Sequence, residues 1–302
     1  MSTNHRPPIN TSRMDTGMLE LIYRYDPDDP IKQPLPSTPA EAITMLEAGN
    51  AAFASLMSSL DTATTQTHVI PVSARDLGLP EPETGSLSQD PFAIVIGCAD
   101  ARVPVELVLG QAANDLFVLR VAGNVLGTEV IGSVDYALHN LPTVRLIVVL
   151  GHTGCGAVQA AVDAWLDPTS YLGLASEHHL RTIVNQVLPA VQLAADAIQQ
   201  AWGEDAATQP GWLETLIDTS VIVNTGMIAT TLAAHLRTAG SSNLRVVFGA
   251  YNIETRTIGI PGIDPEHPLA NRLMQPPSDP VRFRAAAATY AAWHRKASQQ
   301  RS

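Results

Sequence analysis

Four short apolar runs in the middle of the chain constrain its fold more than any other feature. They occupy residues 92–97, 116–119, 146–150 and 244–248. Apart from Arg245, each run is apolar at successive positions, so both faces of a strand formed there must be covered. This is typical of a parallel sheet between two layers of helices. A further strand is expected within residues 249–260, where the chain returns through a turn at the sheet edge.

Helix-forming segments separate and follow these runs. Apolar residues at helical spacing predict helices over residues 132–140, 155–165, 179–202, 227–238 and 285–297. Ahead of the first run, Ser37 or Thr38 offers an N-cap and Pro39 suits the first helical position, so another helix is expected to start there. The predicted fold class is α/β, with a mostly parallel central sheet of four strands, an antiparallel edge strand and helices on both faces.

Two terminal segments flank this predicted domain. Residues 1–37 are expected to form an N-terminal helical arm, with a short amphipathic piece at Met18–Tyr25 before a proline-rich stretch. Residues 38–275 are assigned to the α/β domain, and residues 276–302 to a C-terminal helical extension. Residues 61–90 are polar and interrupted by Pro and Gly, so a loop is expected there.

Charge and composition exclude several classes of partner. The formal net charge is −11, from 29 acidic and 18 basic residues, which argues against binding nucleic acid or an anionic membrane. No apolar run approaches the ~18–20 residues that span a bilayer, and the first residues do not resemble a signal peptide. We therefore expect a cytoplasmic protein whose two cysteines are free thiols.

Both cysteines stand shortly after a predicted buried strand. Cys98 follows the run 92–97, and Cys155 follows the run 146–150, with His152 three residues before it. Open α/β sheets bind ligands at the carboxyl ends of their strands, where these side chains are expected to converge. Two thiolates and one imidazole suit zinc, and three protein ligands leave a fourth position open, as in catalytic zinc sites. Either cysteine alone is best explained as an inert core residue, but their joint placement favours a metal site.

Asp100 and Arg102 follow the first cysteine closely. An arginine beside an aspartate lowers the pKa of the carboxyl group and keeps it ionised. Such a carboxylate can accept a hydrogen bond from a water molecule in the open metal position. It can also turn onto the metal and close the site. The sequence leaves both arrangements open.

The two cysteine motifs together resemble those of the beta-class carbonic anhydrases. That family has Cys-x-Asp-Ser-Arg followed some fifty-odd residues later by His-x-x-Cys. Here Cys-Ala-Asp-Ala-Arg begins at Cys98, and His152 stands 54 residues further on. The segments Leu116–Asn124 and Gly132–Leu138 also resemble family motifs, and the resemblance covers roughly residues 38–260.

The resemblance implies a function and a set of roles. Cys98, His152 and Cys155 would bind Zn²⁺, and Asp100 with Arg102 would form the catalytic dyad. The implied reaction is the reversible hydration of carbon dioxide to bicarbonate and a proton. The implied assembly is a homodimer or a multiple of dimers, with N-terminal arms around the partner subunit and the active site at the interface.

Substrate-binding residues follow from the plant-like subtype of the family, which lines its pocket with Gln, Phe and Tyr. Gln89, Phe117 and Tyr136 occupy the corresponding stretches, although core packing explains Phe117 and Tyr136 equally well. Val103 is expected to contact carbon dioxide. Backbone N–H groups near Gly156, at a helix start, are expected to bind bicarbonate.

Three positions depart from family patterns. Ala101 replaces the usual Ser beside the dyad, and Val121 replaces an Asn whose hydrogen bond would then be missing. Val95 stands where members with an inhibitory bicarbonate site have Trp, so that site is expected to be absent.

Two alternative functions stay open: a hydrolase of carbon disulfide or carbonyl sulfide on the same scaffold, and a catalytically silent zinc-bearing sensor or scaffold.

Overall fold

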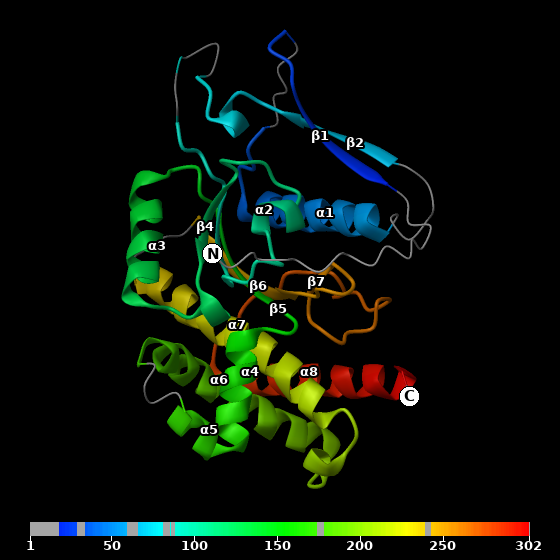
Figure 1. The fold of residues 1–302 in the computed structure, drawn as a ribbon. Coiled ribbons are helices and arrows are strands. Elements are labelled where there is room, and N and C mark those ends of the chain that lie inside the picture. The colour runs from blue at the N-terminus through cyan, green and yellow to red at the C-terminus, as the bar shows by residue number, and fades with distance from the viewer. Residues whose placement is uncertain are drawn as a thin grey trace, which may run out of the picture.

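The computed structural model describes residues 18–28, 34–58, 66–80, 85, 88–173, 178–238 and 243–301. A central sheet lies between two groups of helices, and a small second sheet projects beside them (Figure 1). The described helices are α1 (Pro39–Ser58), α2 (Val105–Val108), α3 (Thr128–Asn140), α4 (Gly156–Leu166), α5 (Pro168–Gly173), α6 (His178–Trp202), α7 (Trp212–Thr238) and α8 (Pro280–Arg301), with short 3₁₀ turns η2 (Arg75–Leu77), η3 (Ala122–Asn124) and η5 (Ala206–Thr208).

The central sheet has five strands in the order β4-β3-β5-β6-β7. Its strands are β3 (Ala93–Gly97), β4 (Leu116–Arg120), β5 (Leu146–His152), β6 (Arg245–Tyr251) and β7 (Ile258–Gly259). The first four are parallel, and β7 runs antiparallel to β6. The four predicted strands and the returning edge strand are confirmed. All residues of β3 and β5 are buried, as their unbroken apolar runs predict.

Alternate residues of each strand pack into two separate apolar clusters. Ile94 and Ile96 of β3 face the cluster built with α3, α4, α6, α7 and α8. Ala93 and Val95 face the cluster built with α1 and α2. Figure 1 shows these two helical groups on opposite sides of the sheet. The expected helices on both faces are therefore present.

Helix α1 begins at the predicted position because the side chains of Thr38 and Glu41 accept hydrogen bonds at its start. The hydroxyl of Thr38 accepts the backbone N–H of Glu41 at 3.2 Å. The carboxylate of Glu41 accepts the backbone N–H and the hydroxyl of Ser37, at 2.8 and 2.9 Å. This reciprocal arrangement is a variant of the capping box, and Pro39 occupies the first helical position.

The expectation of a helical N-terminal arm is wrong for the part that the structure describes. Leu19–Tyr25 forms strand β1, which pairs in parallel with strand β2 (Gln66–Val72). Strand β2 lies within residues 61–90, where a loop was expected. The physical reason is that Ile and Tyr in β1 and Val and Ile in β2 favour strands once a partner strand is available. Residues 1–17 of the predicted arm lie outside the described residues.

Helix α7 begins at Trp212, well before the predicted start of this helix at Met227. Its middle is buried on most sides, and its N-terminal half buries Thr215, Thr219 and Ser220 as well as apolar residues, so the sequence shows no one-sided apolar stripe.

By length and composition, α7 is the only helix in the described part of the chain that could cross a membrane. Of the window that meets those criteria, 67% is buried inside the fold, and the core helix of a soluble protein meets them equally well.

The C-terminal extension packs on its own subunit. Helix α8 contributes Phe283, Ala287 and Tyr290 to the apolar cluster that α6 and α7 also form. The indole N–H of Trp202 in α6 donates to the carbonyl of Ala291 in α8 at 3.1 Å. The sequence left open whether this extension contacts its own subunit or a neighbour.

Candidate metal centre

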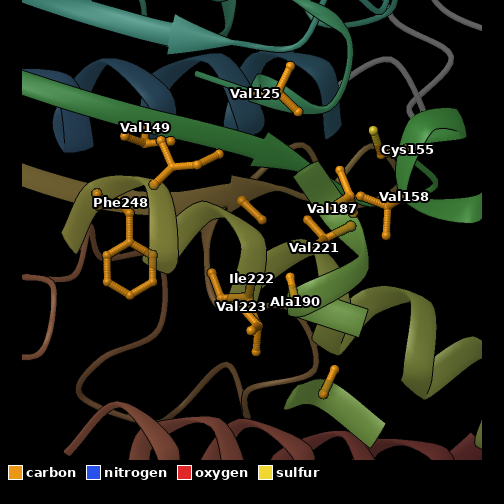
Figure 2. Close-up of a cluster of buried hydrophobic side chains, with 14 of the residues drawn as sticks. Val125, Val149, Cys155, Val158, Val187, Ala190, Val221, Ile222, Val223 and Phe248 are labelled. Atoms are coloured by element: carbon orange, nitrogen blue, oxygen red, sulfur yellow. The ribbon is translucent and has the colours of Figure 1, made fainter. Parts of the chain in front are cut away.

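The three predicted metal ligands meet at the carboxyl end of the sheet. Cys98 directly follows β3, His152 is the last residue of β5, and Cys155 directly precedes α4. Their ligand atoms all lie within 4.8 Å of one another, and the two Sγ atoms are 3.9 Å apart. All three residues are buried. Figure 2 shows Cys155 beside Val158 and Val187, at the edge of the apolar cluster.

The local backbone explains why these ligands converge. Strands β3 and β5 are parallel neighbours, with Gly97 opposite Leu150, so Cys98 and His152 extend just past the same edge. Gly154 adopts a φ of 65°, a left-handed conformation that glycine reaches without steric cost. This turn brings Cys155 back toward His152 at the start of α4.

His152 presents one ring nitrogen to the cysteines. Its Nδ1 lies 3.0 Å from the carbonyl oxygen of Thr153, and a carbonyl only accepts, so Nδ1 carries the proton. The lone pair therefore sits on Nε2, which is buried and has no hydrogen-bond partner among the described residues. Buried polar atoms are almost always paired, so an unpaired one in a cluster of thiols indicates a bound ion.

The two thiols share one proton. A hydrogen bond from the Cys155 thiol lowers the pKa of Cys98 to about 4, and the neighbouring imidazole of His152 adds to this effect. Cys155, which keeps the proton, has its pKa raised by that same hydrogen bond and by burial. Burial acts to lower the pKa of His152, but the Cys98 thiolate, the carbonyl of Thr153 and the Asp100 carboxylate together raise it.

This set of donors fits a zinc ion. Two soft sulfur ligands and one imidazole nitrogen are close enough to share one cation. A cation there would replace the proton between Cys98 and Cys155 and pair the free Nε2 of His152. The geometry of the three predicted ligands is therefore compatible with a bound zinc ion.

Asp100 lies beside this cluster and pairs with Arg102. The Nε and Nη2 atoms of Arg102 donate to the two carboxylate oxygens at 3.0 and 2.7 Å, and the backbone N–H of Arg102 donates to Oδ1 at 2.9 Å. These bonds hold the pKa of Asp100 well below its usual range. Oδ2 of Asp100 lies 3.8 Å from Nε2 of His152. The carboxylate thus borders the ligand set while it faces the guanidinium.

Arg120 is a further contact of the site that sequence reasoning missed. Its Nε donates to the carbonyl of Cys98 at 3.0 Å, and its Nη2 donates to the carbonyl of Asp100 at 2.5 Å. Gly97 and Arg120 are register partners in β3 and β4, which places the guanidinium beside the ligand loop. The signal in the sequence was an arginine at the end of a buried strand.

Comparison with known proteins identifies the family. The carbonic anhydrase family model matches residues 93–258, which contain the three ligand residues, Asp100 and Arg102. The chain belongs to the beta-class carbonic anhydrase family. The resemblance read from the sequence is therefore confirmed.

The curated relatives match over a limited span. Carbonic anhydrase 2 of Mycobacterium tuberculosis is 46% identical over 105 residues, which cover 35% of this chain and 48% of the relative. A carbonic anhydrase of Mycolicibacterium smegmatis is 44% identical over 110 residues, covering 36% and 50%. The chain thus spans about half the length of the curated relatives it matches. Among solved structures, the beta-carbonic anhydrase CafA of Aspergillus fumigatus is 21% identical, with a TM-score of 0.41, covering 67% of this chain and 84% of that chain.

Two of the five predicted substrate-binding residues of this carbonic anhydrase family member lie near the dyad. Val103 is buried in the apolar cluster with α1 and α2, and its N–H donates to the carbonyl of Asp100 at 3.1 Å. Gly156 is exposed at the start of α4, directly after Cys155, and the space beside its Cα is open. Their roles in binding carbon dioxide and bicarbonate stay predictions.

The other three predicted pocket residues are Gln89, Phe117 and Tyr136. Gln89 is exposed in the loop before β3, and this loop is tied to Asn114, ahead of β4, at the end of the sheet opposite Cys98. The rings of Phe117 and Tyr136 lie 6.5 Å apart, and Tyr136 is 54% exposed. The structure does not bring Gln89 to the metal ligands of the same chain.

The three positions that depart from family patterns lie in or next to β3 and after β4. Val95 is fully buried in β3, and Ala101 is exposed in the turn after Asp100. At Val121 the backbone N–H donates to the carbonyl of Gly97 at 3.0 Å. None of the three displaces a ligand or either member of the Asp100–Arg102 pair.

Proposed function

We propose that this protein is a zinc-dependent carbonate dehydratase that catalyses the reversible hydration of carbon dioxide to bicarbonate and a proton. One observation carries the proposal. A buried cluster of two thiols and an unpaired imidazole nitrogen lies next to a carboxylate that an arginine holds ionised. Membership of the carbonic anhydrase family supports the same activity.

The metal would be held by Cys98, His152 and Cys155. A zinc ion bound there supplies Lewis-acid activation of water, for which carbonic anhydrase is itself the standard example. The protein supplies the placement of the ligands. It also supplies a hydrogen bond from His152 Nδ1 to the carbonyl of Thr153, which fixes the orientation of the imidazole ring.

Asp100 orients the attacking water molecule. Its low pKa keeps the carboxylate ionised at neutral pH, so it accepts a hydrogen bond and does not serve as a strong base. Arg102 fixes the carboxylate in one position through two parallel hydrogen bonds, and it is itself held by the carbonyl of Gly154 at 3.2 Å.

Apolar and backbone groups complete the substrate site. Val103 provides a buried apolar contact for carbon dioxide. The backbone N–H of Gly156 opens helix α4 and suits the negative charge of bicarbonate. The pairing of Asp100 with Arg102 favours this catalytic role over the silent sensor or scaffold, because a silenced site requires the carboxylate to leave the arginine.

We also propose that the chain acts as a homodimer, or a multiple of dimers, in the cytoplasm. Strand β1 exposes Leu21, Ile22 and Tyr23, and Met18 just before it is also exposed, although a two-stranded parallel sheet normally needs cover. A second copy would supply that cover. Gln89, Phe117 and Tyr136 would then line the site of the neighbouring subunit. Reduced thiols at Cys98 and Cys155 suit the cytoplasm.

Stopped-flow measurement of carbon dioxide hydration between pH 6.5 and 9, on protein with its zinc content determined, tests the activity. We expect rapid hydration that rises with pH, and a loss of about 100-fold or more in Asp100→Asn with zinc content unchanged. Full zinc occupancy without hydration at any pH would overturn the proposal. Carbon disulfide and carbonyl sulfide would then be assayed as substrates.

A further inference from the structure

Asn124 is a buried polar residue at the end of η3, to which the mechanism above gives no role. It is 2% exposed and adopts a φ of 60°, a left-handed conformation that few side chains other than asparagine tolerate. Its Nδ2 donates to two backbone carbonyls, that of Ile96 at 3.2 Å and that of Leu150 at 2.5 Å. The side-chain amide thus uses both of its N–H donors.

The two carbonyls belong to the strands that carry the metal ligands. Ile96 lies in β3, two residues before Cys98, and Leu150 lies in β5, two residues before His152. One side chain therefore links the two strand ends just below the ligand cluster. Because both acceptors are main-chain atoms, the link acts on the backbone that positions the ligands.

The turn that holds Asn124 is itself anchored on both sides. On one side, the backbone N–H of Val121 donates to the carbonyl of Gly97 in β3 at 3.0 Å. The carbonyl of Gly123 accepts the side-chain amide of Asn224, a buried residue of α7, at 2.8 Å. A continuous set of contacts thus runs from α7 through Gly123 and Asn124 to both ligand-bearing strands.

We infer that Asn124 is a positioning residue of the metal centre, which fixes the separation of Cys98 and His152 and thereby the affinity of the site for its metal. This inference rests on metal binding by the proposed ligand set. Groups that orient metal ligands through hydrogen bonds typically change metal affinity by 10- to 100-fold when they are removed. The same magnitude is expected for Asn124.

The alternative is that Asn124 only stabilises the fold, and Asn50 provides a matched control. Asn50 is 1% exposed, and its Nδ2 also donates to two backbone carbonyls, those of Val108 and Arg256, both at 3.0 Å. It lies on α1, on the other side of the sheet, and links no ligand-bearing strand end. Loss of its amide should affect stability without affecting the metal.

The test compares Asn124→Gly with Asn50→Ala and the native chain. Glycine tolerates the positive φ at position 124, so the first variant removes the amide without straining the backbone. Chelator competition measures the affinity for Zn²⁺ and Co²⁺, and the thiolate-to-Co²⁺ absorption bands report the geometry. Urea unfolding of the metal-free proteins gives their stability. We expect Asn124→Gly to weaken metal affinity by about 10-fold or more and to shift the Co²⁺ bands. Asn50→Ala should change the metal affinity by less than about 2-fold, even if its unfolding free energy falls as much as that of Asn124→Gly.

The outcomes separate this inference from the proposed function. Native metal affinity and unchanged Co²⁺ bands in Asn124→Gly would overturn the inference alone. A native chain that binds neither metal would defeat the proposed function as well. If Asn124→Gly does not fold, Asn124→Asp takes its place. That variant keeps the shape and tolerates positive φ, but its carboxyl group donates at most one hydrogen bond. Native affinity in Asn124→Asp would equally overturn the inference.

Discussion

Arg102 donates hydrogen bonds from Nε and Nη2 to the two carboxylate oxygens of Asp100, at 3.0 and 2.7 Å. The guanidinium side chain is 57% exposed, while the carboxylate is mostly covered and borders the ligand cluster. The pair therefore connects an exposed guanidinium with a covered carboxylate beside the ligand cluster, through two hydrogen bonds that fix their relative orientation. Its planar, two-bond geometry is specific to arginine.

Replacement of Arg102 should reduce the rate of carbon dioxide hydration without loss of metal. Without the guanidinium, the carboxylate of Asp100 is free to rotate, so the orientation of the attacking water is lost. We expect about a 10- to 100-fold lower rate for Arg102→Ala, by analogy with the loss of other groups that position a catalytic residue. Arg102→Lys should recover little, since an ammonium group cannot make the two parallel bonds. A native rate in Arg102→Lys would show that charge alone is sufficient.

The pair also predicts a pH dependence of stability. Because Arg102 lowers the pKa of Asp100 in the folded state, the ionised pair stabilises the fold above the unfolded pKa of ~3.9. That contribution is lost as the pH falls from there toward the lower folded pKa. In metal-free protein, the difference in unfolding free energy between the native chain and Arg102→Ala should be constant above about pH 5 and shrink below about pH 4. Urea unfolding at several pH values measures it, and a constant difference down to pH 3 would indicate lost packing instead.

Removal of one sulfur ligand should abolish tight metal binding. We expect Cys155→Ser to weaken zinc affinity by about 100-fold or more, because two ligands then hold the ion and the hydroxyl is a poor soft donor. Measurement of zinc per chain after dialysis against a chelator checks this, with Asp100→Asn as the control that should retain its metal. Full zinc content in Cys155→Ser would place the metal elsewhere.

Two glycines provide a matched test of the packing of α1 against the end of α2. A Cβ at Gly49 in α1 would lie 2.0 Å from the carbonyl oxygen of Leu109, so Gly49→Ala must displace backbone. Overpacking of this kind should cost about 2 kcal/mol or more of unfolding free energy. A Cβ at Gly132 in α3 meets nothing within 4 Å, so Gly132→Ala should stabilise the protein by up to ~1 kcal/mol. Thermal or urea unfolding of both variants compares them, and equal effects would contradict the packing around Gly49.

Strand β1 should contribute to self-association. Tyr23 is 62% exposed and Ile22 is 42% exposed, so lysine at both positions removes apolar surface without disturbing the core. We expect this double variant to dissociate into monomers at concentrations where the native chain is dimeric. Sedimentation velocity measures the mass, and Leu172→Lys, at a 69% exposed position of α5, is the control. An unchanged mass in the double variant would exclude β1 from the interface.

The sequence predicted the candidate metal centre more fully than its surroundings. Cys98 and His152 could be placed together because parallel strands end at one edge of a sheet, and this rule needs no knowledge of distant contacts. The helix at Pro39 could also be predicted, because its capping residues are local. The role of Asn124 depends on hydrogen bonds to two other strands. Its only local signal is Gly-Asn a few residues after a strand, which is typical of a tight turn.

The two largest errors share a physical origin. Strand β1 needs β2 as its partner, and 47 positions separate the paired residues Glu20 and Thr67, so short-range periodicity could not reveal the pairing. The part of α7 that was missed is buried at every position from 219 to 226, which removes the polar stripe that marks a surface helix. In both cases, tertiary contacts decided the structure that local preference left open.

The pairing of β3 with β5 also has a kinetic consequence. These strands are neighbours in the sheet, yet β4 and α3 lie between them in the chain, so the two halves of the ligand set meet only after a long connection closes. Parallel pairings at such separation form slowly, whereas helices form early. A refolding chain will therefore regain most of its helical signal first and its metal affinity last, and metal uptake will report the completion of folding.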